Sequence, residues 1–173
     1  MMRDIYEVMK MINMIVAIGK NREIGRANQL LASIPEDLKQ FKEKTSGNII
    51  IMGYNTYESL PMGALPQREN IVITRKSIDI PGAHVVGSID AAIEKAVDLR
   101  DDHEVYVIGG SSVYEQFLPH ANRLYITHIF EDFHDADTYF PKIDHNWQLE
   151  SINAGRENID HDFPHVFAVY DRK

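Results

Sequence analysis

The sequence contains no cysteine and a single tryptophan among its 173 residues. Without a thiol the chain can form no disulfide framework, thiolate metal site or cysteine nucleophile, and a reducing cytoplasm is its expected location. Basic residues are also few, with 18 Lys and Arg against 26 Asp and Glu, which argues against nucleic acid or an anionic membrane as a partner. No apolar run approaches the ~20 residues that span a bilayer.

The composition that remains suits one globular domain. Hydrophobic residues make up 44% of the chain and charged residues 25%, enough for one well-buried core. Residues 1–12 are interpreted as an N-terminal extension, because they mix charges of both signs and lack the pattern of a secretory signal. The domain itself is expected over residues 13–173.

Short β-branched runs alternate with helical patterns along this domain. Five runs are predicted as strands: 14–18, 49–52, 71–73, 105–108 and 124–129. Most of them are apolar on both faces, which is typical of central strands of an α/β sheet covered by helices. Ser88 is placed to cap a helix that begins at Ile89. Two later runs, 147–152 and 166–170, are joined by the polar stretch 153–164 and predict a terminal antiparallel hairpin.

A carboxylate interrupts the apolar face of a helix that Pro35 is predicted to begin. Asp37 falls on this face, whose other members are Ile34, Leu38, Phe41 and Thr45. A buried carboxylate costs several kcal/mol unless it is paired, so a fold that keeps one usually has a use for it. The alternative is a solvated acid in the first helical turn, which the helix dipole favours. The helix alone leaves both interpretations open.

Three predicted strands end in residues that can hold phosphate. Gly109 and Gly110 follow one strand, and Gly53 with Thr56 follows another, each before a helical pattern whose free N–H groups could bind an anion. The third strand, 71–73, is followed by Thr74, Arg75 and Lys76, at the sheet edge where open α/β folds bind ligands. Taken singly, these features are also explained by a tight turn, a capping Thr56 and a solvated basic loop. Together they favour a dinucleotide.

No metal site is expected. His161 and His165 have helical spacing only across Pro164, which argues against a zinc pair on a helix. The acidic stretch 131–137 lacks the glycine and the terminal glutamate of a calcium loop.

The order of the motifs resembles the dihydrofolate reductase family from about residue 14 to the C-terminus. The resemblance rests on Ile15-Val16-Ala17, Asn21-Arg22-x-Ile24-Gly25, Ile34-Pro35-Glu36-Asp37-Leu38 with Phe41, Ile51-Met52-Gly53, Thr56-Tyr57-Glu58-Ser59, Leu65-Pro66-x-Arg68-x-Asn70-Ile71-Val72, Val107-Ile108-Gly109-Gly110, Val113 to Pro119, Leu124 to Ile129 and Asp137-Thr138-x-Phe140-Pro141.

This resemblance implies a fold and an activity. The fold would be a single domain with a mixed, mainly parallel eight-stranded sheet flanked by about four helices. The protein would be a cytoplasmic, monomeric oxidoreductase that transfers a hydride from NADPH to 7,8-dihydrofolate, giving tetrahydrofolate for one-carbon metabolism and for thymidylate and purine synthesis.

The resemblance also implies roles for individual residues. Asp37, supported by Thr127, would orient the pterin and promote protonation of its N5 through water. Arg68 would pair with the α-carboxylate of the substrate's glutamate tail, although it could be an ordinary surface arginine. The expected substrate-binding residues are Ile15, Leu38, Phe41, Leu60, Leu65 and Arg68. The expected cofactor-binding residues are Ala17, Ile24, Gly25, Gly53, Thr56, Thr74, Arg75, Lys76, Ile108, Gly109, Gly110, Ser111, Ser112, Val113 and Tyr114, with a cis peptide bond expected in the glycine pair.

The sequence departs from the family pattern in two places. Ala32 stands where the family carries a tryptophan in the loop from Gly19 to Ser33, which predicts altered loop closure in a functional enzyme. Tyr54 and Ser112 stand where related enzymes often carry arginines for the cofactor's 2′-phosphate, which predicts a narrowed preference for NADPH over NADH.

Two other functions fit part of the pattern. A reductase of the riboflavin pathway can share this fold and cofactor, but Asp37 and Arg68 favour a folate-like substrate. A dinucleotide-binding protein without activity is the non-enzymatic alternative, and Ala32 is its best support.

Overall fold

The computed structural model describes residues 12–99, 102–154 and 162–173. The predicted extension, residues 1–12, lies outside this part of the chain except for Ile12, which begins the first strand. His161 also lies outside it. No helix in the described ranges is long and apolar enough to cross a membrane.

Eight strands form one sheet in the order β10-β11-β8-β1-β7-β4-β5-β6. The strands are β1 (Ile12–Ile18), β4 (Ile49–Gly53), β5 (Glu69–Ile73), β6 (Ala83–Val86), β7 (Val105–Gly109), β8 (Arg123–Ile129), β10 (Trp147–Asn153) and β11 (His165–Arg172). All neighbours from β8 to β6 pair in parallel, whereas β11 is antiparallel to both β8 and β10. The predicted mixed, mainly parallel sheet is confirmed.

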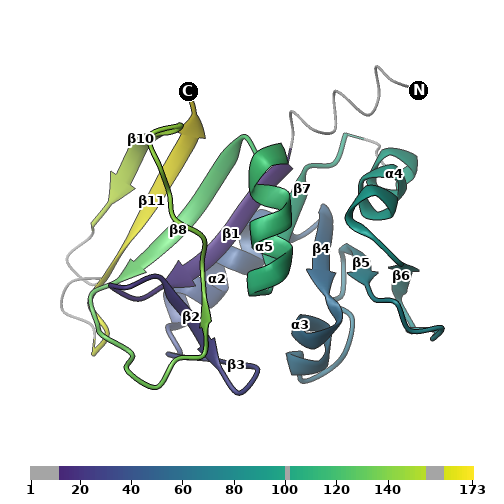
Figure 1. Cartoon of the computed structure of the whole chain (residues 1–173), viewed down its shortest axis with the longest axis horizontal. Coiled ribbons are helices and arrows are strands. Elements are labelled where there is room, and N and C mark those ends of the chain that lie inside the picture. The colour runs from purple at the N-terminus through teal and green to yellow at the C-terminus, as the bar shows by residue number, and fades with distance from the viewer. Residues whose placement is uncertain (1–11, 100–101, 155–161) are drawn as a thin grey trace.

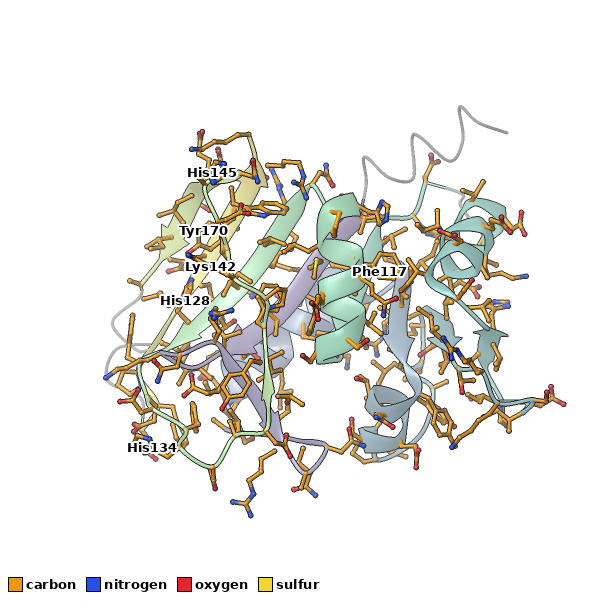
Figure 2. All side chains as sticks on the ribbon, in the orientation of Figure 1. Phe117, His128, His134, Lys142, His145 and Tyr170 are labelled. Atoms are coloured by element: carbon orange, nitrogen blue, oxygen red, sulfur yellow. The ribbon has the colours of Figure 1, made fainter. Side chains whose placement is uncertain are left out.

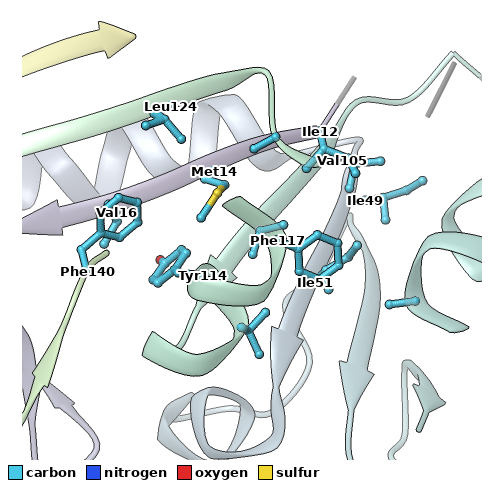
Figure 3. Packing of buried hydrophobic residues seen from close by; sticks show 14 of the residues in the cluster. Ile12, Met14, Val16, Ile49, Ile51, Val105, Tyr114, Phe117, Leu124 and Phe140 are labelled. Carbon is cyan, nitrogen blue, oxygen red and sulfur yellow. The ribbon is translucent and has the colours of Figure 1, made fainter. Parts of the chain in front are cut away.

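Helices cover both faces of this sheet (Figure 1). Four α-helices lie in the described residues: α2 (Pro35–Thr45), α3 (Tyr54–Ser59), α4 (Ile89–Leu99) and α5 (Ser111–Phe117). Residues of α4 and α5 join one core cluster with Met14 and Val16, which is shown from close by in Figure 3. Phe41 of α2 packs against a second cluster around Ile15 and Tyr106. Because alternate residues of β1 belong to opposite clusters, the sheet is buried on both sides, as its apolar runs predict.

The other predicted elements are confirmed with small changes in their ends. Ser88 caps α4, since its hydroxyl oxygen accepts a hydrogen bond from the Ala91 N–H at 3.0 Å. The terminal hairpin is formed by β10 and β11. His128 on β8 and Tyr170 on β11 are joined by a 2.8 Å hydrogen bond, and both are labelled in Figure 2.

A small second sheet has no counterpart in the sequence prediction. It consists of β2 (Glu23–Arg26), β3 (Gln29–Leu30) and β9 (Thr138–Tyr139), in the order β3-β2-β9. These strands are too short to show an alternating pattern. The sheet fixes the loop from Gly19 to Ser33 beside the carboxyl end of β1.

Candidate active site

The carboxyl ends of the parallel strands bring the predicted site residues to one edge of the sheet. In the pairing register, Ala17 of β1 lies opposite Thr127 of β8, and Met52 of β4 lies opposite Gly109 of β7. The third predicted phosphate-binding strand, β5, ends beside β4, with Ile73 opposite Gly53. Residues far apart in sequence therefore line a single edge, which is where open α/β sheets bind ligands.

Asp37 lies at this edge and faces the interior. The buried Thr127 hydroxyl donates a hydrogen bond to Asp37 Oδ1 at 2.6 Å. Burial raises the pKa of Asp37, while the Thr127 hydrogen bond and the charge of nearby His165 act in the opposite direction. The half-buried position of Asp37 and its hydrogen bond with Thr127 favour the paired carboxylate over the solvated acid. A half-buried carboxyl that keeps one fixed donor has a second oxygen available to bind a ligand.

The raised pKa of Asp37 predicts that its ionised carboxylate lowers the free energy of unfolding of the protein. Because the folded state binds the proton more tightly than the unfolded state, the free energy of unfolding falls as pH rises between the unfolded and folded pKa values. Asn cannot ionise, and its amide oxygen can still accept from Thr127. We expect Asp37→Asn to raise the free energy of unfolding by about 0.5–2 kcal/mol at neutral pH.

Urea denaturation of both proteins at several pH values measures this effect. The gain should vanish below the unfolded pKa of aspartate, near 3.8. Equal stability of the two proteins at neutral pH would mean that burial of this carboxylate costs nothing.

Tyr114 is a buried residue near Asp37 and is hydrogen-bonded to Ile15. The Tyr114 hydroxyl donates to the Ile15 carbonyl oxygen at 2.7 Å, and its ring meets Phe140 edge to face. Burial, with a further contribution from the Asp37 charge, raises the pKa of Tyr114, so this phenol stays protonated as a donor. Tyr114 is predicted to bind cofactor, and the structure places it inside the core with its hydroxyl already engaged.

Apolar side chains form a wall on the α2 side of the edge. Phe41, Leu60 and Leu65 are half-buried and pack against the second core cluster with Ile15 and Ile108. Leu38 lies one residue beyond Asp37 and is 48% exposed. An apolar residue left this open beside a buried carboxyl is suited to contact a flat, partly polar ligand.

Arg68 is fastened to the end of α2. Its Nε donates to the Pro66 carbonyl oxygen at 2.9 Å, and its Nη1 donates to Thr45 Oγ1 at 3.1 Å. Partial burial lowers the pKa of Arg68. Two of the five guanidinium N–H groups are thus engaged, which leaves donors for an anionic ligand. Thr45 itself donates to the Phe41 carbonyl oxygen, so α2 holds both Asp37 and the support of Arg68.

The glycine pair lies against Thr56. The peptide bond between Gly109 and Gly110 is cis, as the family resemblance implies, and Gly109 has a φ of +129°, which disfavours any side chain. A Cβ on Gly110 would come within 3.3 Å of Thr56 Oγ1, and a Cβ on Gly53 within 3.1 Å of the Val113 side chain. The strand ends of β4 and β7 are therefore packed closely together, with Gly109 buried and Gly53 and Gly110 half-buried.

The remaining predicted cofactor residues divide into two groups. Thr74, Arg75 and Lys76 line a cavity of about 490 Å³ beyond β5, together with residues 77–80, Ala83 and 85–87. Ser111 and Ser112 make hydrogen bonds within the protein instead. The Ser111 hydroxyl donates to the Tyr139 carbonyl oxygen, and Ser112 accepts from Gln116.

The loop from Gly19 to Ser33 is tied to residues 131–138. The Ala27 N–H donates to Asp137 Oδ2 at 2.9 Å, and Arg26 forms an ion pair with Asp135. Ile24 packs on the first core cluster. Gly25 is buried in the small sheet, where a Cβ would come within 2.9 Å of the Gln29 carbonyl oxygen, so packing alone accounts for this glycine.

Three contributors to the site had not been predicted from the sequence. Thr45 was predicted only as part of an apolar face, yet it anchors Arg68. Glu23, 2% exposed, accepts from the Phe133 N–H and so clamps the loop from Gly19 to Ser33. His165 is fully buried near Asp37, with Nδ1 2.7 Å from the Phe163 carbonyl oxygen. The apolar neighbours of His165 in the sequence could have signalled its burial, whereas Glu23 lies in a polar stretch that gives no such signal.

Comparisons with known proteins agree with this geometry. The family model described as dihydrofolate reductase matches residues 11–172. The chain is 38% identical to the dihydrofolate reductase HdrB of Haloferax volcanii, over 92% of this chain and 82% of the relative. It is also 38% identical to the dihydrofolate reductase of Bacillus subtilis (strain 168), over 94% and 95% of the two chains.

A solved structure extends the likeness to three dimensions. The dihydrofolate reductase from Enterococcus faecalis, complexed with NADP(H) and RAB-propyl, superimposes with a TM-score of 0.83 at 34% identity. The match covers 94% of this chain and 96% of that one. Sequence, fold and the arrangement of the sheet edge thus agree, and the chain belongs to the dihydrofolate reductase family of NADPH-dependent oxidoreductases.

Proposed function

We propose that this protein reduces 7,8-dihydrofolate to tetrahydrofolate with NADPH, and that Asp37 is the residue that binds and orients the pterin. The observation that carries the proposal is the Thr127–Asp37 hydrogen bond of 2.6 Å between the apolar wall and the glycine pair. A carboxyl fixed in this way suits a planar ligand that offers two neighbouring N–H donors. The cytoplasmic location, the monomeric state and the role in one-carbon metabolism remain predictions.

The residues present fit NADPH. A cavity with two cations lies at the carboxyl end of β5, and the glycine pair Gly109 and Gly110 lies at the carboxyl end of β7. These features suit a phosphate-bearing end and a flat ring end of one dinucleotide. When bound, NADPH supplies the hydride of the reaction.

Within this arrangement, Asp37 would hold the pterin and Arg68 its tail. Asp37 accepts the ring's N–H donors on the oxygen that Thr127 leaves available, and its raised pKa favours holding a proton near N5 through water. Leu38, Phe41 and Leu65 exclude other water from the ring. Arg68, already oriented by Pro66 and Thr45, would pair with the terminal carboxylate.

A spectrophotometric assay tests the proposed function. Purified protein is mixed with dihydrofolate and NADPH, and cofactor oxidation is compared with tetrahydrofolate formed. We expect one equivalent of each. Binding of NADPH without turnover would favour the non-enzymatic alternative, and turnover only with a ribosylated pyrimidine substrate would favour the riboflavin-pathway alternative.

Replacing Ala32 by the tryptophan of the family pattern should strengthen substrate binding. Ala32 is partly exposed between β3 and α2, near the end of the loop that Arg26, Glu23 and Asp137 hold. We expect Ala32→Trp to lower the dissociation constant of dihydrofolate about threefold to tenfold, because an indole adds packing surface and an N–H donor.

Equilibrium binding and steady-state turnover measure the effect of Ala32→Trp, with Ala32→Leu as the control for size alone. Unchanged affinity and turnover would mean that the missing indole is not the relevant difference from the family pattern.

A further inference from the structure

An aromatic ring and an ammonium group meet across the carboxyl ends of β4 and β5. Tyr54 follows β4 as the first residue of α3, and Lys76 lies shortly beyond β5. The two strands are parallel neighbours. Lys76 Nζ lies 4.3 Å from the centroid of the Tyr54 ring, a distance typical of a cation–π contact.

Both partners rest on parts of the fold that are fixed. Tyr54 packs against the second core cluster, and its ring centroid lies 6.1 Å from that of Tyr57. The backbone N–H of Lys76 donates to Thr74 Oγ1 at 3.1 Å, and the backbone N–H of Thr74 donates to the Val86 carbonyl oxygen at 2.8 Å. The backbone under Lys76 is thereby held, and contact with the ring restricts the rest of its long side chain.

The adjoining cavity carries a positive balance. Its charged lining residues are Arg75, Lys76 and Asp79, two cations against one carboxylate. An ammonium that already has a restricted orientation loses less conformational entropy when it binds an anion. Tyr54 therefore adds to anion binding without carrying a charge.

We propose that Tyr54 is a specificity-determining residue that orients the Lys76 ammonium toward the 2′-phosphate of NADPH. This inference rests on the proposed function. It changes the interpretation of Tyr54. From the sequence alone, Tyr54 only replaces an arginine that related enzymes often carry at this position. A tyrosine and a lysine from adjacent strands would together supply the cation, and the preference for NADPH over NADH would depend on both.

Binding of NADPH, NADH and 2′,5′-ADP measured by isothermal titration tests the pair. We expect Lys76→Met to weaken NADPH and 2′,5′-ADP about tenfold and to leave NADH unchanged, because only the first two carry the 2′-phosphate. Tyr54→Leu should weaken the same two ligands about twofold to fivefold, and Tyr54→Phe, which keeps the ring, should not. In the Lys76→Met background, Tyr54→Leu should have no further effect.

A second cation–π pair provides the control. Lys44 Nζ lies 4.3 Å from the centroid of the Tyr125 ring, the same distance as in the first pair, and neither residue lines this cavity. Lys44→Met should therefore leave all three affinities unchanged. A variant that misfolds would lose NADH as well, so NADH binding reports the fold. Suppose that the wild type turns over with NADPH, but Tyr54→Leu leaves the ratio of NADPH to NADH affinity unchanged. That result would overturn this inference alone. No binding of either dinucleotide by the wild type would overturn the proposed function and this inference with it.

Discussion

Replacing Asp37 by Asn should lower kcat/KM for dihydrofolate by about 10²–10⁴-fold. Asparagine keeps the size of the side chain and can accept the Thr127 hydrogen bond. It cannot carry the negative charge that the ring's N–H donors require, and it cannot hold a proton for transfer. Its amide would also present a donor where the ligand presents donors. The same substitution is expected to stabilise the fold, so loss of activity would come with a gain in stability.

The pH dependence of turnover separates this role from a structural one. The reaction consumes a proton, and burial raises the pKa of Asp37, so wild-type kcat/KM should rise as pH falls from alkaline values toward that pKa. Asp37→Asn should lose this rise. Thr127→Val, which removes only the supporting hydroxyl, should lower activity less and keep the rise. Asp37→Asn with wild-type rates across this range would contradict the role given to Asp37.

Replacing Arg68 by Gln should raise KM for dihydrofolate about 100-fold with a much smaller change in kcat. Each charge-assisted hydrogen bond is worth about 1.5–3 kcal/mol, and the tail carboxylate would lose a bidentate pair far from the reacting atoms. Because Pro66 and Thr45 hold the guanidinium in place, little of the wild-type binding energy is spent on ordering it.

A truncated substrate provides the control for Arg68. A dihydropterin without the glutamate tail should react equally with wild type and Arg68→Gln, since neither can use the missing carboxylate. Arg68→Lys keeps the charge but loses the planar fork, and we expect an intermediate KM, about tenfold above wild type. A KM effect of the same size on the truncated substrate would show that Arg68 acts on the fold of the site instead.

The sequence predicts the central strands well because they are buried on both faces. Val105–Gly109 and Ile49–Gly53 contain no charged residue and are mostly apolar, so their runs can be recognised without context. The edge strand Ala83–Val86 was missed for the opposite reason. Its residues are half-buried and include His84, which bonds Glu69, so no apolar run marks it.

The candidate site is only half visible in the sequence. Asp37 can be recognised on the face of its helix, but its donor Thr127 lies 90 positions away and meets it only through the sheet. Thr45 and Arg68 lie 23 positions apart and also meet only in the folded chain. The contact of Tyr54 with Lys76 cannot be predicted from either residue alone, because it depends on the register of β4 and β5.

Transfer of a deuterium label tests the central claim most directly, namely that this sheet edge holds NADPH and the pterin together. NADPH labelled with deuterium at the transferred position of C4 is mixed with dihydrofolate and the wild-type protein, and the product is examined by NMR. One deuterium at C6 of tetrahydrofolate per turnover is the predicted result. Oxidation of NADPH without deuterium at C6 would contradict the account.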